Sequence, residues 1–395
     1  MKKYLFLSLL LLLFAAGCKE GDFPKQFPVD STAPKPISDP VVENMNGAVK
    51  ITYKLPNETD LLYVKAVYTN TVGDILEERA SVFKNFVEIR GFGKSKRQTI
   101  QLITVDRSRN ESAPVPVEIE PLDSPIYEIL ENMHIQESWG GFKLSWTNPL
   151  KEQLIVKVYT RDNDGSWIDL ETFYSTEMNA SNAVRGLEPV PQTFYIFIKD
   201  IYENYTDTLE TVLTPYYEIE LPARTQFREL PLAPGYQVSP YSIGWYTMWD
   251  GVINVDQNMY YLGLYDPQPY ITVDMGKLYI LSRTRLWQRA DYIFALHCLR
   301  FFEIWGTADW ENARDPSNWN GWTLLGEFES YKPSGSPPGG AITDEDRAHA
   351  RAGEEFEFPD DVPPIQYIRI RSIENWTKSN GMIIAEWILW GKEYE

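Results

Sequence analysis

The sequence predicts an all-β protein in which two tandem sandwich domains precede a third β-domain of a different kind. Short stretches of alternating apolar and polar residues recur along the chain, and this alternation is typical of half-buried strands. Between residues 33 and 220 a set of such stretches occurs twice at a near-constant spacing, which indicates a duplicated domain. From about residue 225 onward a different series of strand-like stretches follows.

The N-terminus has the features of a secretory signal. Lys2 and Lys3 precede an apolar run over 4–14, and three small residues at 15–17 lead to Cys18. The apolar run is too short to span a bilayer, which needs about 20 residues. A cysteine directly after small residues resembles a bacterial lipobox. That resemblance implies that 1–17 are a signal peptide and that lipidated Cys18 anchors the protein in a membrane.

The residues after Cys18 predict which membrane carries the anchor. The charged stretch 19–22 resembles the export tag of Bacteroidetes-type lipoproteins, which implies a lipid-anchored, cell-surface position on the outer membrane. Four prolines lie between 23 and 36, and they favour an extended spacer. We therefore expect 18–32 to form a membrane-proximal linker.

The duplicated domain is visible in three pairs of strands. Residues 49–56 read VKITYKLP, and the matching stretch FKLSWTNP begins 142 − 49 = 93 positions later. Further pairs are 64–69 with 155–160 and 98–103 with 192–197, within repeats that span 33–121 and 122–220. Such units of short strands and turns suit an immunoglobulin-like sandwich, and their early proline and Tyr-rich later strand resemble fibronectin type III domains.

Matching positions in the two repeats predict matching structural roles. Tyr53 and Trp146 share a strand face with their apolar neighbours, so we expect both side chains in the core. Asp106 and Asp200 follow matching strands and are expected to cap turns rather than to take part in chemistry.

The C-terminal part carries a series of landmarks in a fixed order. They are Trp249-Asp250-Gly251, then 270–276, 300–306, 322–326, 365–371 and 384–391. This series resembles the discoidin family, also called the coagulation factor five/eight type C domain, over 240–395. The resemblance implies an eight-stranded galactose-binding-like jelly roll, with 221–239 as the preceding linker. The segment 307–321, rich in Trp, Asn and Asp, is longer than a minimal family member needs.

Composition limits the function classes. The net charge of −19 argues against nucleic-acid binding, which needs basic patches. Cys298 is the only cysteine besides Cys18, so no intrachain disulfide is expected after lipidation. Because Cys298 lies in an apolar run, we expect a buried, inert thiol.

The sequence contains little that favours catalysis. His134, His297 and His349 have no metal-ligand spacing, and no phosphate loop, dinucleotide fingerprint or nucleophile elbow occurs. The adjacent acids at 354–355 and 360–361 are expected to be solvated rather than to face each other as a glycosidase pair. We therefore expect a protein that is not an enzyme.

Two acidic residues are candidate ligands of a structural Ca²⁺. In discoidin-like sugar modules a calcium ion often lies near the Asp-Gly turn, and the resemblance implies Asp250 and Glu386 as ligands here. Calcium takes six to eight oxygen ligands, so two side chains alone are an incomplete set. In the alternative interpretation, Asp250 only caps the turn and Gly251 supplies a positive φ.

Three loops are expected to form the sugar-binding end of the roll, because sugar contacts in such jelly rolls come from loops at one end. An aromatic ring there would stack on a sugar while polar side chains bond the hydroxyls. Trp376 is the leading candidate because its neighbours are polar. The loops are 240–262, 287–295 and 372–382, and the candidate contacts are Trp376, Asn375, Arg289, Tyr292, Trp245 and Tyr260. Trp322 and Trp387, which lie on strand landmarks, are expected to be structural.

The whole arrangement resembles a group of Bacteroidetes-type lipoproteins found with polysaccharide-utilisation systems. This resemblance implies capture of an extracellular polysaccharide, with the sandwiches as spacers. In the second interpretation, the protein is a non-catalytic scaffold or adhesin that docks onto SusC- and SusD-like outer-membrane proteins. Glycan binding by the C-terminal domain would distinguish the two.

Overall fold

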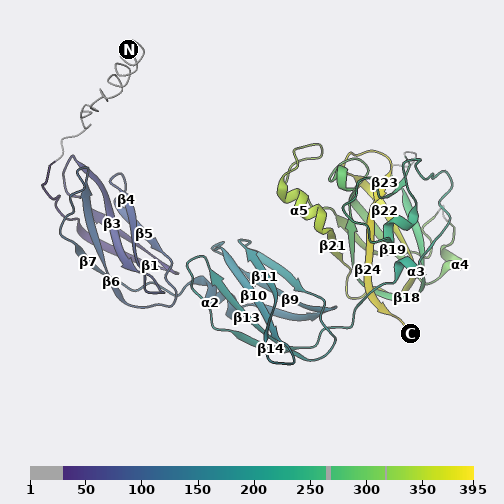
Figure 1. Ribbon diagram of the computed structural model, residues 1–395, viewed down its shortest axis with the longest axis horizontal. Helices are drawn as coiled ribbons and strands as arrows, with labels where there is room; N and C mark the ends of the chain where they lie inside the picture. The colour runs from purple at the N-terminus through teal and green to yellow at the C-terminus, as the bar shows by residue number, and fades with distance from the viewer. Residues whose placement is uncertain (1–29, 264–267, 316–317) are drawn as a thin grey trace, which may run out of the picture. The chain divides into compact units, whose positions relative to one another are not determined.

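The computed structural model of the chain describes residues 30–263, 268–315 and 318–395. The predicted signal peptide, the lipidation site Cys18 and most of the linker 18–32 lie outside these residues. The described part is nearly all β, as the sequence predicts (Figure 1). None of its helices combines the length and the apolar character needed to cross a membrane.

The chain forms two compact units, and the division between them passes through the second sandwich. The first unit runs to Ile135 and also contains Leu144–Asn182 and Thr193–Val212. The second unit contains Gln136–Lys143, Ala183–Gln192 and Leu213–Glu395. The C-terminal roll therefore lies wholly within the second unit.

The first sandwich has two antiparallel sheets. One has the order β1-β2-β5 and the other β4-β3-β6-β7. Alternation along β2 sends Val49, Ile51 and Tyr53 into the core, so the predicted packing role of Tyr53 is confirmed. The strands are β1 (Ser38–Met45), β2 (Ala48–Lys54), β3 (Leu61–Thr69), β4 (Ile75–Ser81), β5 (Phe86–Arg90), β6 (Gln98–Asp106) and β7 (Val115–Ile119).

The second sandwich repeats this strand order, as expected for a duplicated domain. Its sheets are β12-β9-β8 and β11-β10-β13-β14, preceded by the short helix α2 (Pro125–Glu131). Trp146 on β9 is buried like Tyr53, which confirms the second core prediction. The strands are β8 (His134–Ser138), β9 (Gly141–Thr147), β10 (Leu154–Arg161), β11 (Trp167–Ser175), β12 (Asn179–Val184), β13 (Gln192–Asp200) and β14 (Leu209–Leu213).

The two predicted aspartate turns have the same hydrogen bonds. Asp106 accepts from the backbone and side-chain nitrogens of Asn110, both at 2.9 Å. Asp200 accepts from the same atoms of Asn204 at 3.0 and 2.8 Å, and also from the Tyr202 backbone at 2.8 Å. The capping roles are therefore confirmed.

Replacing Asp200 by Ala is expected to lower the free energy of unfolding of the second sandwich by about 2 kcal/mol, because the turn donors lose their acceptor. Urea unfolding followed by tryptophan fluorescence measures the change. The exposed Asp207→Ala is the matched control and should change stability by less than about 0.5 kcal/mol. An Asp200→Ala variant as stable as this control would contradict the turn's contribution.

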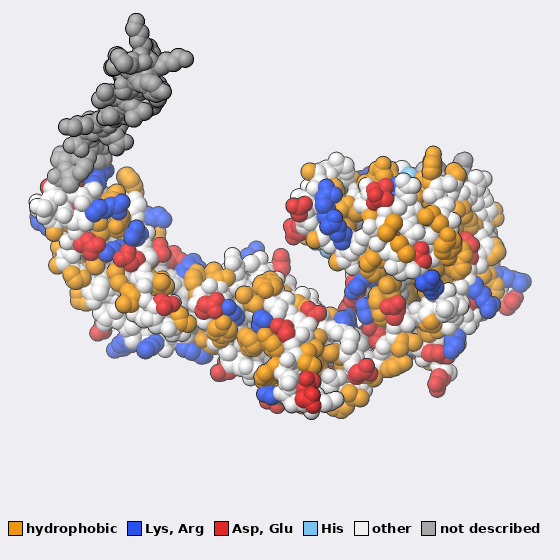
Figure 2. Space-filling model, viewed as in Figure 1, with side chains coloured by type: hydrophobic (Ala, Val, Ile, Leu, Met, Phe, Trp, Pro, Cys, Tyr) orange, Lys and Arg blue, Asp and Glu red, His pale blue; other side chains and the backbone are white. Residues whose placement is uncertain are grey.

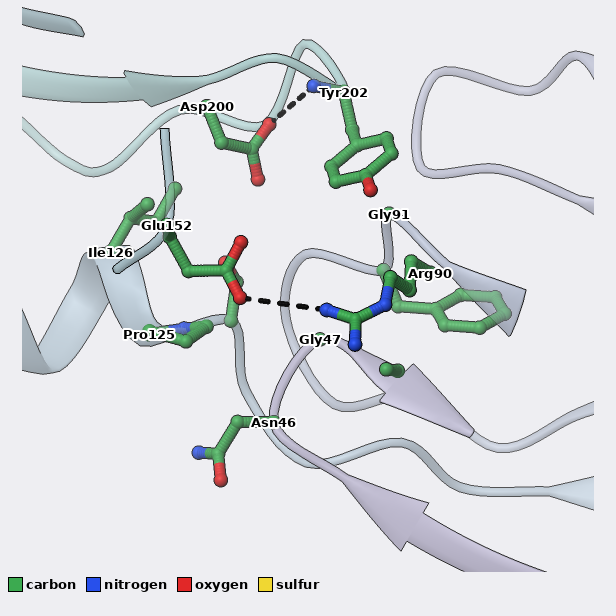
Figure 3. Close-up of a pocket in the computed structure, with 12 residues that line it drawn as sticks. Asn46, Gly47, Arg90, Gly91, Pro125, Ile126, Glu152, Asp200 and Tyr202 are labelled. Carbon is green, nitrogen blue, oxygen red and sulfur yellow. Dashed lines mark hydrogen bonds and ion pairs between the residues drawn. The ribbon is translucent and has the colours of Figure 1, made fainter. Parts of the chain in front are cut away.

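Asp200 and Tyr202 also line a cavity in the first unit, with Arg90 and Glu152 across it (Figure 3). The Arg90 guanidinium lies 3.7 Å from the Glu152 carboxylate. The cavity volume is only about 20 Å³, which is room for a water molecule and not for a sugar. We therefore assign this cavity no ligand.

The roll contains an eight-stranded sheet and a separate two-stranded one. The main order is β15-β24-β18-β22-β19-β20, with β16 and β21 also paired to β18, while β17 pairs with β23. The strands are β15 (Ile219–Glu220), β16 (Arg228–Glu229), β17 (Tyr260–Leu262), β18 (Tyr270–Trp287), β19 (Leu299–Thr307), β20 (Thr323–Glu329), β21 (Glu354–Glu357), β22 (Ile365–Asn375), β23 (Met382–Ile384) and β24 (Glu386–Glu393). Short helices are α3 (Ala223–Gln226), η1 (Trp245–Trp249), η2 (Ala290–Tyr292), α4 (Trp310–Ala313) and α5 (Asp344–Ala352).

The long strand β18 connects the layers of the roll. Its register breaks between Asp274 and Tyr279, where Gly276 has a φ of +80° that favours glycine. Residues before the break pair with β22, and those after it pair mainly with β24 and β21. The eight strands are consequently hydrogen-bonded into one continuous sheet.

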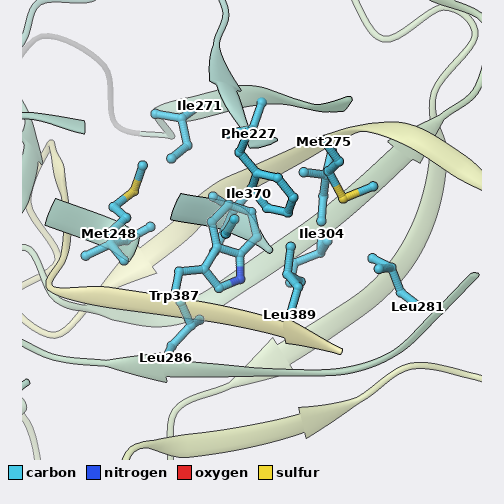
Figure 4. Packing of buried hydrophobic residues seen from close by; sticks show 14 of the residues in the cluster. Phe227, Met248, Ile271, Met275, Leu281, Leu286, Ile304, Ile370, Trp387 and Leu389 are labelled. Atoms are coloured by element: carbon cyan, nitrogen blue, oxygen red, sulfur yellow. The ribbon is translucent and has the colours of Figure 1, made fainter. Parts of the chain in front are cut away.

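The core of the roll surrounds Trp387 (Figure 4). Its ring is fully buried, and its Nε1 donates to Thr284 Oγ1 at 2.7 Å. Trp322 and Cys298 are buried too, so the structural roles predicted for all three are confirmed. Burial raises the pKa of the Cys298 thiol to about 12, which keeps it protonated and unreactive.

The segment 221–239 does not behave as a linker, and that part of the domain prediction is wrong. Leu221 and Phe227 are buried in the core of the roll, and β16 pairs with β18. The roll also includes β15, which pairs with the last strand. Pro231, Pro234 and Gly235 are typical of a boundary, but the apolar residues before them complete the core.

Candidate functional site

The three loops 240–262, 287–295 and 372–382, here called the loop cluster, lie together as predicted. The Trp376 backbone nitrogen donates to Cys298 O at 3.0 Å, and the Tyr261 ring stacks on His297 with centroids 5.1 Å apart. A second small core joins the loops to α5. It contains Met259, Tyr261, Phe294, Cys298, Ala350, Trp376 and Ile383.

Trp376 is not available to a ligand, and its assignment as the leading sugar contact is wrong. Only 4% of the residue is exposed. The ring packs against Phe294 at 5.1 Å, and its Nε1 donates to Ser330 Oγ at 3.2 Å. The polar neighbours correctly indicated a loop. However, Lys378 has a φ of +55°, and Thr377 and Lys378 face water while the indole faces inward.

Asn375 and Tyr260 are also buried, so these two assignments are corrected. The Asn375 side chain donates to Ser379 O at 2.6 Å and to Gly381 O at 3.0 Å, and thereby shapes the loop. The Tyr260 hydroxyl donates to Glu229 Oε1 at 3.1 Å, and burial raises its pKa strongly. Both side chains form these hydrogen bonds within the protein.

Trp245 contributes to packing rather than to an open surface. It is half-buried at the start of η1, and its ring lies 5.2 Å from that of Trp249 in a T-shaped contact. The exposed ring beside it belongs to Tyr246, which is 55% exposed. Alternation rules for strands cannot identify which of two adjacent aromatics faces the core in a short 3₁₀ helix.

Tyr292 lies at the surface of the loop cluster, and the mostly buried Arg289, whose side chain is 13% exposed, lies beside it. Tyr292 is 44% exposed, and the Arg289 guanidinium lies 4.7 Å from the centre of its ring. Arg289 also forms a two-point ion pair with Asp291 at 2.5 and 2.6 Å. The hydrogen bonds from Arg289 lower the pKa of the Asp291 carboxyl, so the pair stays charged at neutral pH.

Tyr241 extends this surface, although the sequence did not single it out. It is 77% exposed. The backbone beside it is joined to Tyr261, because Tyr261 N donates to Ser242 Oγ at 3.0 Å. Tyr241 and Tyr292 are thus two exposed rings of the loop cluster, and we name Tyr241, Arg289, Asp291 and Tyr292 the tyrosine–arginine surface.

The loop cluster is strained. Asn254, Gln257, Phe294, Leu296 and Lys378 all have positive φ and lie in or beside these loops. For Phe and Leu such a conformation is costly and persists only where the surroundings impose it. Strain of this kind gathers at ligand-binding segments, so its location supports a functional role for this end of the roll.

Glu354 stabilises the conformation of the loop cluster through buried hydrogen bonds. Its carboxylate accepts hydrogen bonds from Tyr331 N at 2.7 Å, Ser330 Oγ at 2.6 Å and Gln288 Nε2 at 3.0 Å, and it contacts His349 Nε2 at 3.3 Å. Only 6% of the residue is exposed. The expectation that the acids at 354–355 are solvated is therefore wrong.

Two hydrogen-bond partners of Glu354, Gln288 and Ser330, also bond residues of the loop cluster. Gln288 Oε1 accepts from the backbone nitrogen of the strained Phe294 at 2.5 Å. Ser330 Oγ accepts from the indole of Trp376 at 3.2 Å. The local sequence does not predict this hydrogen-bond network, because every partner of Glu354 except His349 is more than 20 positions away.

The predicted calcium ligands Asp250 and Glu386 lie side by side. Glu386 is 3% exposed, and within the described residues its carboxylate receives only long hydrogen bonds from Gly251 N, at 3.2 and 3.3 Å. Burial, and next the charge of Asp250, raise the pKa of Glu386 to about 8. A buried carboxylate with so little compensation fits a cation-binding role.

The turn at Asp250 also has the predicted alternative role. Asp250 Oδ1 accepts from Val252 N at 2.8 Å, and Gly251 has a φ of +76°. Both carboxylates line a cavity of about 320 Å³. Among the described residues no three His, Cys, Asp or Glu side chains form a metal-binding group, so backbone carbonyls and water would have to supply the other oxygens.

Three families match the chain, and each is a domain of unknown function. DUF4959 matches residues 34–121, DUF5126 matches 122–224 and DUF5000 matches 249–391. No curated protein matches the chain.

Among solved structures, the chain is similar to a SusE-like protein at 28% identity, over 68% of this chain and 100% of that one, with a TM-score of 0.43. It is also similar to the CBM32-3 module of a family 31 glycoside hydrolase from Clostridium perfringens (16% identity, 43% of this chain and 93% of that one, TM-score 0.32). A segment of two fibronectin type III domains from chicken tenascin matches at 13% identity, over 46% of this chain and 99% of that one, with a TM-score of 0.22.

Proposed function

We propose that this protein is a non-catalytic, glycan-binding surface protein, held at the outer membrane by a lipid on Cys18. Its C-terminal roll binds an extracellular polysaccharide, and the sandwiches serve as spacers. The observation that carries the proposal is the tyrosine–arginine surface, which combines the exposed rings of Tyr241 and Tyr292 with the charged pair Arg289–Asp291. The proposal includes a structural Ca²⁺ at Asp250 and Glu386.

The chemistry of this surface suits a sugar. The face of a tyrosine ring packs against the C–H face of a pyranose, and the guanidinium and carboxylate have donors and acceptors for hydroxyl groups. Because Glu354 holds the loops through a buried network, little ordering would be required on binding, which favours affinity. Arg289 and Asp291 compensate each other, so the surface suits a neutral sugar better than a charged one.

The test is binding of the chain without residues 1–18 to starch, galactomannan, xyloglucan and mixed-linkage β-glucan, by affinity electrophoresis and calorimetry. We expect one or more to bind, and Tyr292→Ala and Arg289→Ala each to weaken binding about tenfold, which corresponds to about 1.4 kcal/mol. Tyr394→Ala removes a tyrosine of similar exposure, 49%, and is the matched control.

Equal binding by the Tyr292→Ala, Arg289→Ala and control variants would reject this surface as the site. Failure of the unaltered chain to bind any glycan, together with co-purification of a SusC- or SusD-like protein, would favour the scaffold function instead.

A further inference from the structure

The roll has a second face on which aromatic and polar side chains are arranged in rows. Along β22, Ile368 and Ile370 point into the core, so Tyr367, Arg369 and Arg371 lie on the opposite face. The register places Trp305 opposite Arg369 and Glu303 opposite Arg371. Nothing in the local sequence distinguished this face from an ordinary sheet surface.

Four half-buried rings cover much of this face. Trp305 and Trp319 are in contact, with ring centres 4.9 Å apart, and Trp310 stacks on Tyr367 at 4.7 Å and 26°. Trp310 and Trp319 belong to the long segment 307–321, and these contacts place both rings against the sheet. We name Trp305, Trp310, Trp319 and Tyr367 the aromatic face. Figure 1 shows α4, which begins at Trp310, on the side of the roll away from α5.

Polar side chains stand among the rings with their charges paired. Arg371 donates to Glu303 Oε2 at 3.2 Å and to Gln268 Oε1 at 2.6 Å. The Trp305 indole donates to the same Glu303 oxygen at 2.8 Å. Arg371, Glu303 and Gln268 are each only partly buried, so they remain in reach of a hydroxyl-bearing ligand.

The buried Arg369 packs against the rings of Trp319 and Trp322. It is 1% exposed, and its guanidinium lies 4.1 Å from the ring centre of Trp322 and 5.0 Å from that of Trp319. It donates to Thr272 Oγ1 at 2.9 Å and to Asn318 O at 3.1 Å. In the described part of the chain no carboxylate lies within 4.0 Å of it. Its cation–π contacts and hydrogen bonds therefore hold Trp319 in place.

We infer that the aromatic face is a second carbohydrate-binding surface, which takes a neutral polysaccharide along the strand direction. Tyr367 and Arg369 are two positions apart on one strand, so the two ring pairs are spaced by about 7 Å along it. Rings at that spacing suit consecutive sugars of a chain rather than one sugar. The paired charges and the net charge of −19 disfavour a polyanion, and Figure 2 shows acidic and basic side chains interspersed over the visible face.

This inference extends the proposed glycan binding to a separate site, so the two must be tested separately. The probes are xyloglucan, galactomannan, starch and mixed-linkage β-glucan and their hexasaccharides, on the chain without residues 1–18. We expect Trp310→Ala and Trp319→Ala each to weaken binding at this site about fivefold to tenfold, so that fewer than two hexasaccharides bind at concentrations that just fill both sites of the unaltered chain. Tyr292→Ala should weaken binding at the tyrosine–arginine surface about tenfold and leave binding at the aromatic face unchanged.

The matched control is Trp167→Ala, which removes a 53% exposed tryptophan from the second sandwich and should leave binding unchanged. A second readout needs no variant: bound glycan should protect Trp310 and Trp319 from oxidation by N-bromosuccinimide, as measured by peptide mass spectrometry. Near-UV circular dichroism confirms folding of each variant.

The outcomes separate the two claims. If folded Trp310→Ala and Trp319→Ala bind with unchanged affinity and stoichiometry while Tyr292→Ala fails, the aromatic face is overturned and the proposed function stands. Loss of binding in the Trp variants alone supports the aromatic face and overturns the tyrosine–arginine surface. Absence of any binding overturns both.

Discussion

Replacing Glu354 by Ala is expected to lower the free energy of unfolding of the roll by about 3 kcal/mol and to disorder the loop cluster. Tyr331 N, Ser330 Oγ and Gln288 Nε2 would lose their buried acceptor together, and each buried donor without a partner costs about 1–3 kcal/mol. Without Gln288 in place, the strained backbone at Phe294 loses the contact that maintains it.

Urea unfolding measures the stability change, and the near-UV signal of Trp376 reports the loop. Glu354→Gln keeps one acceptor oxygen and should cost less than the Ala variant. Glu329→Ala, with a side chain 57% exposed on β20, is the matched control and should be nearly neutral. Binding at the tyrosine–arginine surface should fall in Glu354→Ala and persist in Glu329→Ala. If Glu354→Ala kept the stability and loop signal of the control, the network would not be what orders these loops.

Without calcium, the roll is expected to become less stable as pH rises from about 5 to 8. The pKa of Glu386 is raised from 4.5 to about 8, chiefly by burial. Between these values the unfolded chain releases the Glu386 proton and the folded chain retains it. Unfolding is therefore favoured with rising pH, by at most about 1.4 kcal/mol per pH unit. The stabilising contribution is complete below pH 4.5 and is lost above pH 8.

Calcium should reverse this trend, because it binds the deprotonated carboxylates. At pH 8 we expect 2 mM Ca²⁺ to raise the melting temperature by about 5 °C or more, and a chelator to remove the gain. At pH 5 the effect of Ca²⁺ should be small. Differential scanning calorimetry over this pH range provides the measurement.

Glu386→Gln should abolish both the pH slope and the calcium response, and without calcium it should be more stable than the unaltered chain at pH 9. Glu220→Gln changes an exposed acid that lines the same cavity, so it should keep both responses. A calcium effect that survives in Glu386→Gln would place the ion elsewhere.

The strands could be predicted because their signal is local. Alternation and the 93-residue repeat predict Tyr53 and Trp146 as equivalent core residues, and both are buried. A side chain's face in a regular strand follows from its neighbours alone. The same reasoning correctly predicted Trp387 as a structural residue.

The binding residues could not be predicted as well, because loops have no such period. Trp376 lies among polar residues and is nevertheless buried, since its direction depends on the turn at Lys378 and on Ser330, 46 positions away. Likewise, the aromatic face depends on which strands are neighbours. Trp305 and Arg369 are brought together only by the pairing of β19 with β22.

The pairing of β15 with β24 determines when the roll can fold. These strands are the first and last of the roll, and the central Trp387 lies on the last one. The strand near residue 219 can therefore pair only after the strand near residue 390 is available. Closing so long a loop makes folding slow. In a chain that crosses a membrane from its N-terminus, each sandwich can complete itself early. On such a path the C-terminal roll is the last part of the chain to fold.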